Sequence, residues 1–144
     1  MSCSVTTRRA YAEDTKLSVP ETRQEIETML RRVSANRIVH MDEPAEALVM
    51  FELAGRLIRL QVPIPADATE QQRKALWRAL LIIMKAKLVA VDRGVSTVEQ
   101  EFLAHVVLPD GQTVARWFEP QLQAAFERGA MPTSPLLLEG PKNG

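Results

Sequence analysis

The stretch from Thr69 to Gly94 constrains the fold most, because it has the length, spacing and end signals of one long amphipathic helix. Thr69 and Gln72 form a capping-box pattern, and Gly94 can adopt the left-handed conformation that often ends a helix. Apolar residues recur at spacings of three and four, at Leu76, Ala79, Leu80, Ile83, Met84, Leu88 and Val91. Trp77 and Leu81 widen this stripe. We therefore expect a core to assemble around this helix, with contacts on two of its sides.

A shorter helix is predicted on the N-terminal side. Ser18 is followed by Pro20 and Glu21, which is typical of a helix start because proline is tolerated in the first turn. Apolar residues then follow at helical spacing up to about residue 35, at Ile26, Met29, Leu30 and Val33. This pattern predicts an amphipathic helix that packs on one side.

Three short strands are predicted between the two helices. Residues 37–41 are rich in β-branched side chains and are followed by the turn composition of residues 42–44. In residues 47–62, the pair Ala54 and Gly55 is placed to form a hairpin loop. That loop pairs Phe51 with Ile58 on an apolar face and leaves a mixed face on the other side of the ribbon. The mixed face carries Leu48, Met50, Leu57, Arg59 and Gln61.

Two further helices are expected after the long one. Ser96 and Glu99 form a second capping-box pattern, which predicts a short helix with an apolar face extending to about residue 107. Thr113 can cap a last helix that ends at Gly129 and is bent or restarted at Pro120. We expect Trp117 and Phe118, on this helix, to be core or interface anchors.

These elements predict an α+β fold in which a small antiparallel sheet of about three strands packs on a long central helix and two or three shorter helices. The 144 residues, 46% of them hydrophobic, suffice for one domain with a real core. We expect a flexible N-terminal lead over residues 1–15, one α+β domain over 16–130, and a tail rich in proline and glycine over 131–144.

Several classes of function lack their sequence signals. Cys3 is the single cysteine, so neither a disulfide framework nor a cysteine metal site is expected. The glycines are isolated, which argues against a phosphate-binding loop, and no cofactor is predicted. The longest apolar run, residues 80–84, is far too short to cross a bilayer. We expect a cytoplasmic protein without a membrane partner.

Catalysis is not favoured either. His105 follows Glu101 by four residues, so the two side chains could meet on one helix face and raise the proton affinity of the imidazole. A structural role for His105, and for His40, is the more ordinary interpretation. The acidic residues Asp42 and Glu43 indicate a solvated turn rather than a metal site. We therefore expect neither an enzyme nor a metal site.

The leading hypothesis is nucleic-acid binding through a local basic face. The 18 Lys and Arg residues balance the 18 Asp and Glu residues, so no overall charge draws the chain to DNA or RNA. The long helix nevertheless carries an excess of cations on its predicted solvent side, and Arg37, Arg56 and Arg59 of the sheet could join it. The candidate phosphate contacts are Arg73, Lys74, Arg78, Lys85 and Arg59.

The alternative hypothesis is a protein-binding inhibitor or adaptor that acts on a host machine. Its candidate contacts are apolar residues of the mixed sheet face and of the tail: Leu48, Met50, Leu57, Leu136, Leu137 and Leu138. Apolar residues in excess of what a small interior needs are often buried in a homo-oligomer or against a partner. An additional layer of helices from the same chain could cover the sheet face equally well.

Four segments resemble a family of small uncharacterised proteins of bacteriophages and prophages: WRALL at 77–81, KAKL at 85–88, EFLAH at 101–105 and LPDG at 108–111. The resemblance extends from Lys16 to Pro132. It implies a phage-encoded protein in a host cytoplasm, where proteins of this size commonly assist DNA transactions or inhibit a host defence or replication machine. The resemblance includes no defining motif and implies no catalytic residue.

Overall fold

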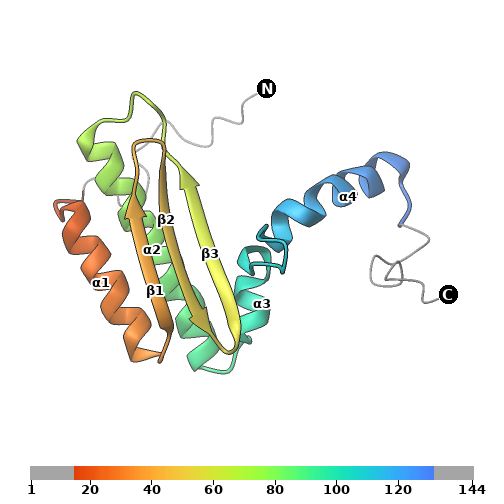
Figure 1. Cartoon of the computed structure of the whole chain (residues 1–144), viewed down its shortest axis with the longest axis horizontal. Coiled ribbons are helices and arrows are strands. Elements are labelled where there is room, and N and C mark those ends of the chain that lie inside the picture. Colours follow the sequence, from red (N-terminus) through yellow and green to blue (C-terminus); the bar gives the residue numbers. More distant parts are fainter. Residues whose placement is uncertain (1–14, 132–144) are drawn as a thin grey trace.

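The computed structural model describes residues 15–131 and shows a sheet backed by two helices, with a third long helix projecting from the body (Figure 1). The elements, in order, are α1 (Val19–Arg32), β1 (Asn36–Asp42), β2 (Glu46–Leu53), β3 (Arg56–Pro63), α2 (Glu70–Asp92), α3 (Val98–Phe102), the 3-10 turn η1 (Leu103–His105) and α4 (Val114–Arg128). The predicted α+β class and the long central helix are confirmed.

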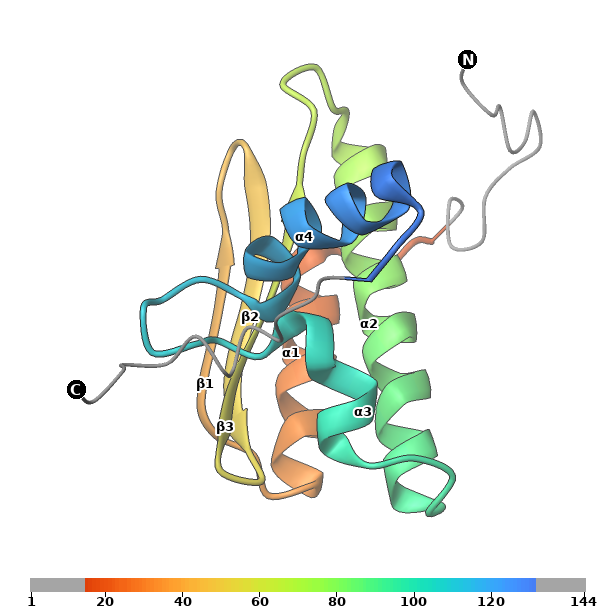
Figure 2. The same cartoon turned by 90° about the vertical axis from the view of Figure 1, so that its right-hand side faces the viewer.

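The sheet is an antiparallel meander with the order β1-β2-β3. Ala54 and Gly55, with φ angles of 52° and 75°, form the tight loop between β2 and β3, and the predicted register is confirmed, with Phe51 opposite Ile58. Positive φ angles at both loop residues match the right-handed twist of the paired strands. Helices α1 and α2 lie together on one face of this sheet (Figures 1 and 2).

Helix α2 supplies much of the core. The Thr69 hydroxyl accepts from Gln72 N at 3.1 Å and the Gln72 side chain accepts from Thr69 N at 2.8 Å, so the predicted capping box is confirmed. The buried residues of the helix are Trp77, Leu80, Leu81, Met84 and Leu88. The predicted stripe contains three of these residues and its predicted widening contains the other two, but the buried side is rotated toward Trp77: Trp77 is fully buried, whereas Ile83 is 49% exposed.

The segment after α2 differs from the prediction. Thr97 and Gln100 form the second capping box, not Ser96 and Glu99, and the helix ends at Phe102 instead of continuing to about residue 107. The chain leaves the helix because Val106 and Val107 bridge to residues elsewhere, Val106 to Ile58 and Val107 to Thr113. Backbone pairing with β3 therefore prevails over the local helical pattern.

Helix α4 begins and ends where the sequence predicts. The Thr113 hydroxyl accepts from Arg116 N, and Gly129 has a φ of 66° in the left-handed region. The helix contains Pro120 and has no buried residue, and it points away from the sheet and α2 (Figure 1). Trp117 and Phe118 are therefore not core anchors, and the alternative that they anchor an interface stays a prediction. Most of the predicted lead and tail, including Leu136, Leu137 and Leu138, lies outside the described residues.

We predict that Leu30→Ala lowers the free energy of unfolding by about 2–5 kcal/mol, because it removes a fully buried side chain from the contact of α1 with α2 and the sheet. Leu103→Ala is the matched control, since Leu103 is 51% exposed, and it should cost less than about 1 kcal/mol. Denaturant titration measures both. Equal losses in the two variants would contradict the described core.

Candidate interaction surface

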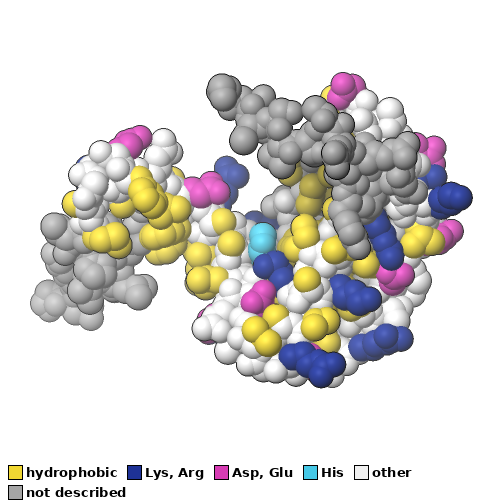
Figure 3. Space-filling view, turned by 180° about the vertical axis from the view of Figure 1, so that it is seen from behind, with side chains coloured by type: hydrophobic (Ala, Val, Ile, Leu, Met, Phe, Trp, Pro, Cys, Tyr) yellow, Lys and Arg dark blue, Asp and Glu magenta, His cyan; other side chains and the backbone are white. Residues whose placement is uncertain are grey.

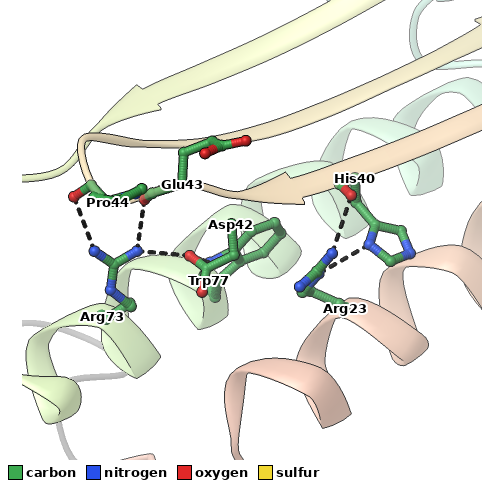
Figure 4. Close-up of polar contacts among 7 residues, drawn as sticks. All are labelled: Arg23, His40, Asp42, Glu43, Pro44, Arg73 and Trp77. Carbon is green, nitrogen blue, oxygen red and sulfur yellow. Dashed lines mark hydrogen bonds and ion pairs between the residues drawn. The ribbon is translucent and has the colours of Figure 1, made fainter.

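Arg73, a predicted phosphate contact, holds the turn between β1 and β2 (Figure 4). Its Nη1 donates to Asp42 Oδ1 at 2.7 Å and to the carbonyl oxygen of Glu43 at 2.9 Å, and its Nη2 donates to the carbonyl oxygen of Pro44 at 3.0 Å. Asp42 Oδ1 also accepts from Trp77 Nε1 at 3.0 Å. The guanidinium therefore holds the turn against α2. The acidic turn, which the sequence predicts to be solvated, thus also has a structural role.

Arg23 extends this network on the α1 side. Its guanidinium lies over the Trp77 ring, 5.6 Å from the centroid, while Nε donates to His40 Nδ1 at 2.9 Å and Nη2 donates to the His40 carbonyl oxygen at 3.0 Å (Figure 4). His40 Nε2 lies 3.4 Å from Glu27 Oε1. These contacts join α1, β1 and α2, so His40 has the structural role that the sequence favours.

The remaining candidate phosphate contacts do not lie on one surface. Arg78 donates to Glu25 Oε2 at 2.9 Å, and Arg59 Nη2 donates to the Gly111 carbonyl oxygen at 2.9 Å. Arg59 is on the sheet face opposite to α2, because its neighbours Ile58 and Leu60 point into the core. Lys74 and Lys85 have no ion-pair partner within residues 15–131. Of the five candidates, these two lysines on α2 are the ones that lack both an ion-pair and a hydrogen-bond partner among the described residues.

The structure brings together the sheet residues of the alternative hypothesis. Leu48, Met50 and Leu57 lie on the face away from α1 and α2, where β1 adds Val39 opposite Met50 and Met41 opposite Leu48. Val39 and Met41 are each 38% exposed. No described helix covers this face (Figures 1 and 2). We call these five residues the open sheet face.

Sequence reasoning missed Val39 and Met41 as members of this surface. The alternation of β1 places Val39 and Met41 on the side opposite to Ile38 and His40. It does not tell which of the two sides faces the core, because that depends on the pairing of β1 with β2. That pairing contains an irregularity between Asn36 and Val39, which a uniform alternation does not reveal.

A cleft of about 570 Å³ borders this face beside β3. It lies between the outer side of β3, the turn at residues 109–112 and the start of α4. Its polar lining residues include Arg59, Gln61, His105, Asp110, Arg116 and Glu119. The cations and carboxylates balance, and Asp110 already accepts from Gln112.

The contact that His105 could make with Glu101 is not formed. Glu101 pairs instead with Lys87, whose Nζ lies 3.9 Å from Glu101 Oε1 and donates to the Glu101 carbonyl oxygen at 2.8 Å. Burial lowers the pKa of His105 below 6.5, and the charge of Lys87 lowers it further. The imidazole is therefore neutral near pH 7, and its proton affinity is reduced, not raised.

Within residues 15–131, no three His, Cys, Asp or Glu side chains are grouped so that they could hold a metal ion. Over the same residues, none of the helices combines the length and apolar character needed to cross a bilayer. No family model, curated protein or solved structure matches the chain.

We predict that Arg73→Ala lowers the free energy of unfolding by about 1.5–3 kcal/mol, because it leaves the partly buried Asp42 carboxylate and two carbonyl groups without their charged donor. Arg56→Ala is the matched control, because the Arg56–Glu99 pair is 52% and 59% exposed and should contribute less than about 1 kcal/mol. Thermal or denaturant unfolding provides the comparison. If Arg73→Ala lowers the free energy of unfolding no more than Arg56→Ala does, Arg73 does not hold the turn as described.

We also predict that His105 makes stability depend on pH. Its folded-state pKa lies below the unfolded value of 6.5, so the unfolded chain binds more protons and stability falls as the pH drops from 6.5 through the folded-state pKa. Above that window the His105 contribution is constant. The variant His105→Gln should have a shallower decrease over this range when unfolding is measured at a series of pH values. An unchanged difference between the two proteins at every pH would contradict the shift.

Proposed function

We propose that the chain is a non-catalytic protein-binding module, whose partner packs on the open sheet face as an additional structural layer. An inhibitor or adaptor of a host machine would act in this way. The observation that carries the proposal is an apolar, uncovered side of a sheet whose other side is already filled by α1 and α2.

An antiparallel sheet with one solvated face normally alternates apolar and polar residues. Strand β2 departs from that rule, because Leu48 and Met50 point outward while Val49 and Phe51 point into the core. Leu48 is only 6% exposed even without a covering element, since its strand neighbours shield it. Such near-continuous apolar character is typical of a strand buried on both faces.

The rim of this face indicates the chemistry of the partner. Arg59 lies opposite Met50, and the Gln61 amide donates to Glu46 Oε2 at 3.1 Å along the β2–β3 border. Arg59 Nε is buried without a hydrogen-bond partner in the described residues. We propose an amphipathic helix as the partner element, with its apolar side on the open sheet face and an acidic residue near Arg59.

The geometry supports nucleic-acid binding less well. Arg73 and Arg78 are engaged by Asp42 and Glu25, and Arg59 lies on the opposite side of the sheet from Lys74 and Lys85. A duplex or a single strand would need these cations on one continuous surface. The test below therefore includes nucleic-acid binding as one of its possible outcomes.

We predict that the double variant Val39→Gln and Met41→Gln loses a protein partner that the wild-type chain retains from nuclease-treated host extract. The change removes apolar contact without altering charge, at two positions that are each 38% exposed. Val95→Gln is the control, because Val95 is 79% exposed and lies outside the open sheet face. The retained protein is then purified, and its affinity is measured for all three chains by calorimetry.

Equal binding by the double variant and wild type, with both chains folded, would refute the open sheet face as the docking site. Retention of no protein would also count against the proposal. Binding to short DNA that weakens steeply with salt, and is lost in Lys74→Ala with Lys85→Ala, would favour the nucleic-acid hypothesis instead.

A further inference from the structure

We infer that the cleft beside β3 is a carboxylate-binding pocket, in which Arg59 and Arg116 hold an acidic side chain of the protein that packs on the open sheet face. The source of this carboxylate rests on the proposed function, whereas the pocket rests on the contacts within the cleft alone. Two guanidinium groups carry the inference, because they line one cleft and have no ion-pair partner among residues 15–131.

The cleft lies where a partner on the open sheet face would reach it. Its floor comes from Arg59 and Gln61 of β3, and Arg59 is opposite Met50 of that face. One wall is the turn at residues 109–112, and the other is the start of α4. Figure 3 shows α4 as a lobe that stands apart from the helical body, so only its first turns approach β3. The volume of about 570 Å³ is ample for one side chain.

The Arg59 guanidinium is positioned by the turn but is not neutralised. Its Nη2 donates to the Gly111 carbonyl oxygen at 2.9 Å, and no carboxylate of the described residues lies within ion-pair distance of it. Nε is buried without a hydrogen-bond partner in the same residues, and Nη1 makes no hydrogen bond to them either. Unpaired donors of a charged group cost free energy when they leave water, and an anion in the cleft would offset that cost.

Arg116 is the second cation of the cleft, and its place on α4 is unusual. It is in the first turn of the helix, where its backbone N–H donates to the Thr113 hydroxyl at 3.3 Å. The positive end of the helix dipole disfavours a cation there, and this turn carries no acidic residue. The exposed Arg116 side chain forms no hydrogen bond or ion pair with the described residues. A carboxylate beside it would be stabilised by the guanidinium and by the helix end together.

The two acidic residues of the cleft do not neutralise these arginines. Asp110 Oδ1 accepts from Gln112 N at 3.0 Å, and Oδ2 accepts from Gln112 Nε2 at 2.6 Å, so both oxygens are occupied within the turn. Glu119 is exposed and forms no ion pair within residues 15–131. The cleft therefore has equal numbers of cations and carboxylates, yet its cations lack direct ionic partners in the part of the chain that the structure describes.

The balance of charges favours a carboxylate over a phosphate group. A guanidinium can bind either anion through two parallel hydrogen bonds. A phosphate monoester carries about two negative charges at pH 7, and Asp110 and Glu119 would repel the second one. His105, which also lines the cleft, is neutral near pH 7 and adds no third cation. Because Arg59 borders the open sheet face, an Asp or Glu side chain can reach the cleft from the polar edge of a helix that packs there.

The first test titrates the full chain with N-acetyl-glutamate N-methylamide, a blocked glutamate, at pH 7 and constant ionic strength. We expect saturable changes in the backbone amide NMR signals of Gly111, Gln112 and Ala115, which line the cleft. The corresponding blocked glutamine has the same shape without the charge and should leave those signals unchanged. Arg116→Gln should weaken binding of the blocked glutamate at least about tenfold, because it removes a charged pair of donors.

Arg128→Gln is the matched control, since it removes the same charge from the exposed last turn of α4 and should leave the affinity unchanged. Arg59→Lys keeps the positive charge but not the planar pair of donors, so it should also weaken binding. The inference is overturned if the blocked glutamate causes no saturable change, if Arg116→Gln and Arg128→Gln weaken its binding equally, or if inorganic phosphate binds more tightly.

The second test determines whether the carboxylate belongs to the partner. Arg116→Gln should lower the affinity for the protein retained from host extract at least about tenfold by calorimetry, and Arg128→Gln should not. An unchanged affinity would assign the pocket to a free small acid and overturn its role in docking. If the wild type binds blocked glutamate while the Val39→Gln, Met41→Gln variant keeps its partner affinity, only the open sheet face is contradicted. The reverse pattern contradicts only the pocket.

Discussion

The packing of α2 on the sheet depends on the carboxylate of Asp42, at the end of β1. Trp77, which is fully buried, donates its indole N–H to Asp42, and Arg73 neutralises the same oxygen while holding the adjoining turn. Without an acceptor at the end of β1, the indole N–H would lose its solvation when α2 packs on the sheet. One acidic side chain therefore fixes both the rotation of α2 and the position of the β1–β2 turn.

Most of the secondary structure could be predicted because local chemistry determines it. The hairpin register follows from alternation and from the loop at Ala54 and Gly55, and the ends of α2 follow from Thr69 and Gly94. The rotation of α2 could not be predicted in the same way. Apolar residues surround much of this helix, so periodicity fits a stripe that includes Ile83 as well as the observed one that includes Trp77.

The candidate site was less predictable because its partners come from distant parts of the chain. Arg73 and Asp42 are 31 residues apart, and Arg78 and Glu25 are 53 residues apart. A helix with excess cations predicts a basic surface when it is viewed alone, yet packing against α1 and β1 supplies carboxylates that no local pattern reveals. The mixed sheet face was easier to identify, because the hairpin register alone places Leu48, Met50 and Leu57 together.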